Sequence, residues 1–183
     1  AASDVNKRQE WERNPAHELL FCFEECYGYL AGTHARDKDA VVTAMLICEM
    51  AAYFKSLGKT LSDVLAELYE TYGYYYDKSL SYTLKGLEGG RRIAAIMEEA
   101  RSLDMKSVIP ETVETLDFEK GIGGLPRENV LKYRLAGGGW FAIRPSGTEP
   151  KIKFYYSLRG RNEEEALRLF GAYRSRLEKQ FGL

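Results

Sequence analysis

The sequence of 183 residues predicts an α+β fold in two parts: a C-terminal domain with an antiparallel sheet flanked by helices, preceded by an incomplete α/β domain of one strand and helices. Three observations predict it. The chain is 45% hydrophobic and has 13 Tyr and 8 Phe, which excludes disorder and supplies a core. Strand-like alternation dominates after Gly73, where the composition shifts, whereas a single apolar run stands among helical patterns before it. We therefore expect domains over residues 1–72 and 73–183.

The one strand expected in the first part is residues 19–23 (LLFCF), an unbroken apolar run typical of a buried strand. It ends at Glu24 and Glu25, and a loop that contains glycines is expected to follow as far as Gly32. Ligands of open α/β sheets lie at the carboxyl ends of strands. Two carboxylates there could accept hydrogen bonds from the hydroxyls of a sugar, and the alternative is a solvated strand end.

Two helices are predicted next. Residues 36–39 (RDKD) open a helix that Gly58 ends, and its apolar side chains lie almost all round its axis, which predicts burial on most sides. The positive charge of Lys38 is unfavourable beside the positive end of the helix dipole. Either an external anion or pairing with the neighbouring aspartates would explain its presence there. Thr60 and Asp63 predict the N-cap of the second helix.

The second part is predicted to run strand, helix, several strands, helix. Residues 74–84 alternate as a half-buried strand does, and residues 88–102 place four apolar side chains on one helical face. Those four are Ile93, Ile96, Met97 and Ala100. Further strand-like runs cover residues 109–118, 130–135, 140–144 and 151–158. A last helix is expected from Asn162, with three glutamates that complement its dipole.

Charge and cysteine content exclude several function classes. Residues 1–72 carry 7 basic and 12 acidic side chains against 19 and 15 in residues 73–183, so only the second half attracts anions. This excess is too small to predict nucleic-acid binding, and no apolar stretch reaches the roughly 18 residues of a membrane span. Three cysteines argue against a disulfide framework and for a reducing, cytoplasmic location. Cys22 and Cys26 lack the partners of a zinc site, so no metal is expected.

The segment with the clearest chemistry is residues 144–151 (RPSGTEPK), which join two predicted strands. An Arg offers a planar fork of donors, two hydroxyls add donors, and a Gly lets a ligand approach the backbone. Such groups converging on one point describe a phosphate cradle, although an ordinary Pro/Ser/Gly turn has the same composition. The residues expected to hold phosphate are Arg144, Ser146, Gly147, Thr148 and Lys153.

Together these segments resemble the α-D-phosphohexomutase superfamily, the phosphoglucomutases and phosphomannomutases. Residues 23–29 (FEECYGY) are similar to the sugar-recognition loop of the third domain in that family, and residues 36–40 (RDKDA) to the motif that follows it. Residues 144–150 (RPSGTEP) are similar to the phosphate-binding loop of the fourth domain. The details favour the phosphoglucomutase-like branch. The resemblance implies that residues 1–72 end the third domain and residues 73–183 form the fourth.

The resemblance also implies roles for individual residues. Glu24 and Cys26 would contact sugar hydroxyls, with Glu25 supporting them, and Lys38 would contact the substrate. The phosphate that is not being transferred would be held by Arg144, Ser146, Gly147 and Thr148, with Lys153 as a basic helper. The chain departs from the family at Cys22, where Gly is usual, and at Cys26, where Ser is usual.

The implied reaction of the parent enzyme interconverts hexose 1-phosphate and hexose 6-phosphate, with Mg²⁺ as cofactor and hexose 1,6-bisphosphate as intermediate and activator. The 183 residues contain neither a Ser-His-Asn-Pro-like phosphoryl-carrier loop nor an Asp-x-Asp-x-Asp magnesium loop. We therefore expect no catalytic residue here and a fragment inactive by itself, whose partners are a sugar phosphate and the upstream domains of the same chain. Two alternatives stay open: a stand-alone α+β module that binds phosphorylated ligands or nucleic acid, and a structural interaction domain.

Overall fold

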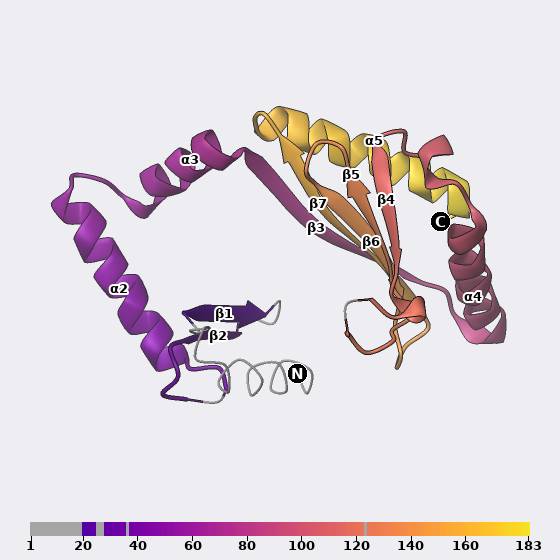
Figure 1. The fold of residues 1–183 in the computed structure, drawn as a ribbon, viewed down its shortest axis with the longest axis horizontal. Helices are drawn as coiled ribbons and strands as arrows, with labels where there is room; N and C mark the ends of the chain where they lie inside the picture. Colours follow the sequence, from indigo (N-terminus) through magenta and orange to yellow (C-terminus); the bar gives the residue numbers. More distant parts are fainter. Residues whose placement is uncertain (1–19, 25–27, 36, 123) are drawn as a thin grey trace. The chain divides into compact units, whose positions relative to one another are not determined.

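The computed structural model describes residues 20–24, 28–35, 37–122 and 124–183 (Figure 1), and the chain divides into two compact units with the boundary after Ala66. The strands are β1 (Phe21–Glu24), β2 (Gly28–Ala31), β3 (Tyr74–Thr83), β4 (Thr112–Asp117), β5 (Leu131–Leu135), β6 (Trp140–Pro145) and β7 (Lys151–Gly160). The helices are α2 (Ala40–Ser56), α3 (Leu61–Tyr72), α4 (Gly86–Ser102) and α5 (Glu163–Phe181), with 3-10 turns η1 (Met105–Ser107) and η2 (Phe118–Lys120).

The second unit is an antiparallel sheet of five strands in the order β3-β7-β6-β5-β4, as the alternating patterns predicted. Successive strands β5, β6 and β7 are neighbours joined by short connections, whereas β3 reaches its partner β7 from far away in the sequence. Helix α5 packs on β7 and β3, and α4 packs on β6. The predicted α+β class, with an antiparallel sheet flanked by helices, is confirmed.

The core of this unit lies between the two helices and one face of the sheet. Every second residue of β7 is buried, and the fully covered ones include Ile152 and Phe154. Tyr133 of β5 stacks on Phe141 of β6 with ring centroids 4.6 Å apart, and neither side chain is exposed. The predicted face of α4 is buried as a set: Ile93, Ile96, Met97 and Ala100. Burying an Ile, Met or Phe side chain contributes about 1.5–3 kcal/mol, so this unit has a substantial core of its own.

Local signals set the ends of the helices in this unit. The Asn162 side chain accepts a hydrogen bond from the Glu165 N–H, as predicted for the N-cap of α5. Three glutamates occupy the first turn, and Gly182 ends the helix in the left-handed conformation at φ +62°. At the start of α4, a Cβ on Gly89 would lie 1.8 Å from the Leu84 carbonyl oxygen, so only glycine permits this close packing.

The first unit differs from its prediction at the strand. The apolar run does form β1, but β1 pairs in antiparallel fashion with β2, which occupies the segment expected to be a loop. The run is exposed rather than buried: Leu20 retains 73% and Phe23 74% of their accessible surface. The prediction of a buried strand was wrong. An apolar sequence indicates that a strand is suited to packing against other elements, but it does not show that the described residues include those elements.

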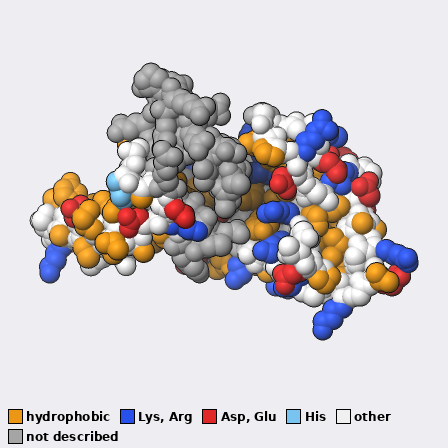
Figure 2. Space-filling model, turned by 90° about the horizontal axis from the view of Figure 1, so that it is seen from below, with side chains coloured by type: hydrophobic (Ala, Val, Ile, Leu, Met, Phe, Trp, Pro, Cys, Tyr) orange, Lys and Arg blue, Asp and Glu red, His pale blue; other side chains and the backbone are white. Residues whose placement is uncertain are grey.

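Helix α2 confirms its predicted bounds and contradicts its predicted burial. Asp39 caps it by accepting hydrogen bonds from the Val41 and Val42 N–H groups, and Gly58 follows its end with φ +75°. None of its residues is buried, and Met45 is 52% exposed. Figure 2 shows hydrophobic side chains gathered on the surface of this unit, at the left of the view. Helix α2 is apolar on most sides, as predicted, but no segment among the described residues covers these apolar side chains.

Helix α3 begins at the predicted capping motif. The Asp63 N–H donates to the Thr60 hydroxyl, and the Asp63 carboxylate in turn accepts from the Thr60 N–H, which is a reciprocal cap.

Among the described residues no single helix is long and apolar enough to cross a membrane. Helices α2 and α3 pass that test only as a pair, with a bend of 84° between them.

Candidate phosphate-binding site

The predicted phosphate loop is the hairpin connection between β6 and β7. Arg144 stands at the end of β6, and its direct antiparallel partner on β7 is Lys153. Both belong to the residues that alternate with the buried set, so both lie on the face of the sheet away from α4 and α5. Within the described part of the chain neither side chain makes a hydrogen bond or an ion pair with another residue. The fold therefore places two uncompensated cations side by side.

The loop keeps its shape through bonds of its own. The Ser146 N–H donates to the Lys151 carbonyl at 2.8 Å, and the Glu149 N–H donates to the Ser146 hydroxyl at 3.3 Å. The Lys151 ammonium pairs with the Glu149 carboxylate at 3.0 Å, so Lys151 is neutralised where Lys153 is not. Gly147 and Thr148 are exposed, and a Cβ on Gly147 would meet nothing within 4 Å. The backbone there is open to a ligand.

Sheet register adds two hydroxyls that the sequence did not indicate. On β3, Ser81 is the Cα partner of Lys153 and Thr83 is the partner of Lys151. A row of polar groups thus runs across three neighbouring strands from Arg144 through Lys153 to Ser81. No local signal could have found these hydroxyls, because their place depends on the pairing of strands about 70 residues apart in the sequence.

A cavity of about 600 Å³ lies at the opposite end of the sheet from this loop. It is lined near the end of β7 by Arg159 and Arg161 and by three glutamates, among them Glu165. Arg161 donates to Glu165 at 2.9 Å, and this hydrogen bond lowers the pKa of the Glu165 carboxyl to about 2. More acidic than basic groups line the cavity, so it suits an anion less well than the loop does. None of the predicted site residues lines it.

The predicted sugar-binding residues belong to the first unit. Glu24 is the last residue of β1 and the partner of Gly28, while Glu25 and Cys26 lie outside the described residues. Lys38 is exposed in the turn before α2, and its N–H donates to the Asp37 carboxylate at 2.7 Å. These residues therefore keep their predicted roles as hypotheses.

The same turn is fixed by a second interaction. Asp39 contacts His34, with 3.0 Å between the Nε2 and Oδ2 atoms, and this hydrogen bond, with that from the Val42 N–H, lowers the pKa of the Asp39 carboxyl. Among the described residues, no three His, Cys, Asp or Glu side chains lie close enough together to hold a metal ion. No step through Mg²⁺ is therefore assigned to the residues that the structure describes.

Comparison with known proteins gives a consistent family. Residues 11–72 match the model of phosphoglucomutase/phosphomannomutase α/β/α domain III, and residues 90–171 match the model of the phosphoglucomutase/phosphomannomutase C-terminal domain. The phosphoglucomutase of Staphylococcus haemolyticus is 40% identical over 167 residues, and that of Staphylococcus aureus strain bovine RF122 is 40% identical over 166 residues. Each alignment covers 84% of this chain and 30% of the relative.

A solved structure shares the fold. The open form of pp63/parafusin, a phosphoglucomutase from Paramecium, superposes with a TM-score of 0.66 over 88% of this chain and 30% of its own, at 14% identity. The chain thus spans about 30% of the length of the relatives it matches. With two consecutive domain models of one family matched over most of its residues, the chain belongs to the phosphoglucomutase/phosphomannomutase family.

Proposed function

We propose that the chain is the substrate-binding C-terminal part of a phosphoglucomutase or phosphomannomutase that interconverts hexose 1-phosphate and hexose 6-phosphate through a bisphosphorylated sugar. In this proposal residues 1–72 complete the third domain and residues 73–183 are the fourth. Two observations support it: both family models match in this order, and the cations of Arg144 and Lys153 stand unpaired beside an open loop.

The loop would hold the phosphate that is not being transferred. The Arg144 guanidinium presents a planar pair of N–H donors to two phosphate oxygens, and the Lys153 ammonium neutralises further charge from the adjacent strand. The exposed backbone at Gly147 and the hydroxyls of Ser146 and Thr148 would complete the cradle. These groups bind through charge and hydrogen bonds alone, so they can grip a phosphate on either end of a sugar.

The sugar would be oriented by Glu24, Glu25, Cys26 and Lys38 from the first unit. Carboxylates accept hydrogen bonds from hydroxyls, and the ammonium donates to them. Phosphoryl transfer itself needs a positioned donor and metal-stabilised charge. We assign that chemistry, with its Mg²⁺ and the hexose 1,6-bisphosphate intermediate, to parts of the longer relatives that these residues do not match, and the 183-residue chain should not turn over substrate.

The proposal is tested by measuring glucose 1-phosphate binding calorimetrically to the chain and to Arg144→Gln. Loss of a charge-assisted, bidentate contact should weaken binding by about 10-fold or more. Arg134→Gln is the matched control, because Arg134 lies on the same face but already pairs with Glu114 at 3.2 Å. Equal weakening by both variants would show general attraction to a basic surface instead of a cradle.

The same substitution probes the parent enzyme. In a full-length phosphoglucomutase that contains this segment, Arg144→Ala should raise KM, because the contact anchors the bound substrate, and lower kcat, because the same contact orients the sugar for phosphoryl transfer. Unchanged kinetics would remove the role given to Arg144.

A further inference from the structure

The connection between β4 and β5 leads into β5, the neighbour of the strand that carries Arg144. It runs over residues 118–130 and leaves the sheet at the same end as residues 145–151, as Figure 1 shows. The first residue of β5, Leu131, pairs with Ile143, and the next residue along β6 is Arg144. At the neck of the connection the Phe118 N–H donates to the Val130 carbonyl at 3.0 Å. Whatever fixes this neck also fixes the strand beside Arg144.

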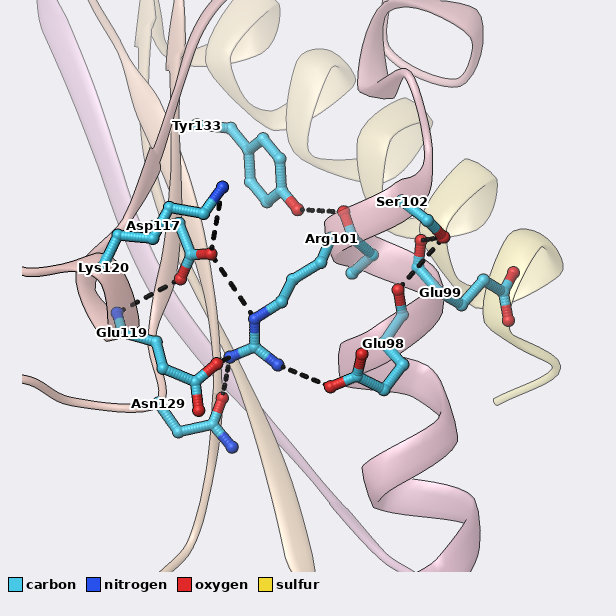
Figure 3. Close-up of polar contacts among 10 residues, drawn as sticks. Glu98, Glu99, Arg101, Ser102, Asp117, Glu119, Lys120, Asn129 and Tyr133 are labelled. Atoms are coloured by element: carbon cyan, nitrogen blue, oxygen red, sulfur yellow. Dashed lines mark hydrogen bonds and ion pairs between the residues drawn. The ribbon is translucent and has the colours of Figure 1, made fainter.

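One guanidinium closes that neck. Arg101, in the last turn of α4, contacts Glu119 with its Nη2 atom at 2.8 Å, and the same nitrogen donates to the Asn129 side-chain oxygen (Figure 3). Its Nε atom faces the Asp117 carboxylate at 3.6 Å. The contacted residues lie at both the beginning and the end of the connection, so Arg101 clamps its two ends together.

The clamp is built on a rigid base. The Tyr133 hydroxyl, from the buried core of β5, donates to the Ala100 carbonyl at 3.0 Å, which ties the end of α4 to the sheet just before Arg101. The Arg101 side chain is only 15% exposed, and its Nη1 atom also contacts Glu98 at 3.1 Å. The backbone that carries the guanidinium is therefore set by the core.

The chemistry of the cluster requires an arginine. Its acceptors lie around a planar group in different directions, and a fork of five N–H donors can reach them together. A lysine keeps the charge but places it on one compact nitrogen, which cannot occupy at once the Nε, Nη1 and Nη2 positions that face Asp117, Glu98 and Glu119. Without this bridge, Asn129 at the end of the connection loses its link through the guanidinium to Glu119 at the beginning. Lys120 pairs with Asp117 at 3.7 Å but reaches only this one side of the neck.

We propose that Arg101 is a positioning residue for the phosphate site. By clamping the two ends of the connection it holds the start of β5 and, through the pairing of β5 with β6, the base of Arg144 in the geometry that binds phosphate. This inference rests on the proposed function of the 144–153 segment. It predicts that a change more than 40 residues away in sequence from Arg144, without any change of charge, weakens phosphate binding.

The test compares the full chain with Arg101→Lys by hydrogen–deuterium exchange and by calorimetric titration with glucose 1-phosphate. Arg101→Lys should increase deuterium uptake in residues 118–130 and weaken binding by about threefold to tenfold, the range of an ordering effect near 1 kcal/mol. Arg91→Lys is the matched control on the same helix, because its pair with Glu88 at 2.8 Å is exposed. It should change neither quantity.

The outcomes separate the two proposals. If glucose 1-phosphate protects residues 144–153 and Arg101→Lys binds it as tightly as the unaltered chain, the positioning role fails and the proposed function stands. If the ligand protects none of residues 144–153, both fail. Should Arg101→Lys not fold, Asn129→Ala removes a single exposed contact. The Asn129→Ala variant should weaken glucose 1-phosphate binding by about twofold and leave the melting temperature unchanged. An unaltered affinity would overturn the inference.

Discussion

The two units of the chain use similar apolar residues to opposite effect. In the second unit Ile96 and Phe141 are completely buried between helices and sheet, and the core joins four strands with two helices. In the first unit α2 has no buried residue, and Leu30 of β2 is the one buried hydrophobic side chain among the residues that the structure describes there. Helices of similar length thus differ in how much of their apolar surface other elements cover.

This difference shows that a high content of apolar residues does not by itself make a unit stable. A helix that is apolar on most sides needs neighbours on most sides, and burial, not apolar content, supplies the free energy of folding. The second unit should therefore carry its own cooperative stability, and the first should depend on further contacts. The candidate phosphate loop belongs to this second unit, and a complete core suits a site that has to keep fixed cations in place.

The strongest test separates the units. Residues 67–183 expressed alone should unfold cooperatively in urea and give a dispersed amide NMR spectrum, because their core is complete. Residues 1–66 alone should give a narrow spectrum without a cooperative transition. A cooperative transition in the shorter piece would break the comparison.

Two methionines, one in each unit, give a finer test of the difference in burial between the units. Met97→Ala in α4 removes a side chain that is 1% exposed and should lower the free energy of unfolding by about 2–5 kcal/mol. Met45→Ala in α2 removes one that is 52% exposed and should change it by less than about 0.5 kcal/mol. Urea denaturation of the full chain measures both, and equal losses would mean that α2 is enclosed in solution.

Alkaline pH should act on the second unit through its tyrosines. Burial, reinforced by the hydrogen bond from the Tyr82 hydroxyl to Glu178 at 2.7 Å, raises the pKa of Tyr82 to about 12. Since the folded state favours the protonated phenol, its contribution is complete below pH 10 and is lost as the pH rises from about 10 to 12.

Unfolding titrations at successive pH values check this window. Tyr82→Phe should be less stable than the unaltered chain at pH 8 and should lose less stability between pH 10 and 12. An identical pH dependence in the variant would remove Tyr82 from the explanation.

Two helix caps give the smallest contrast. Asn162→Ala deletes the cap of α5 and should lower the global stability by about 1 kcal/mol, because α5 closes the core. Asp39→Ala deletes the cap of α2 and should speed amide exchange within α2 while leaving the global unfolding midpoint unchanged. A shifted midpoint in Asp39→Ala would show that the two units unfold together.

Sequence periodicity predicted the elements whose partners lie within the chain. The apolar face of α4, the alternation of β7 and the caps at Asn162 and Thr60 all follow from side-chain spacing, which local geometry determines. The hairpin position of the candidate phosphate loop was also predicted, since two strand patterns flank it.

The remaining features depend on pairings that no local pattern contains. Strand β2 was not predicted because it has only four residues, none of them β-branched, and its sequence shows no alternation of polar and apolar side chains. The exposure of α2 depends on what covers it. Patterns in a single sequence do not specify how distant segments pair. The position of Ser81 beside Lys153 and that of Arg101 between the ends of the 118–130 connection both depend on such pairings.

The central claim, a phosphate cradle on a self-supporting unit, is tested most directly by an NMR titration of the full chain with glucose 1-phosphate. We predict that the largest amide shifts lie in residues 144–153, with Arg144 and Gly147 among them. Absence of any shift up to millimolar ligand, or shifts at the 144–153 segment produced by an oligonucleotide and not by the sugar phosphate, would contradict the claim.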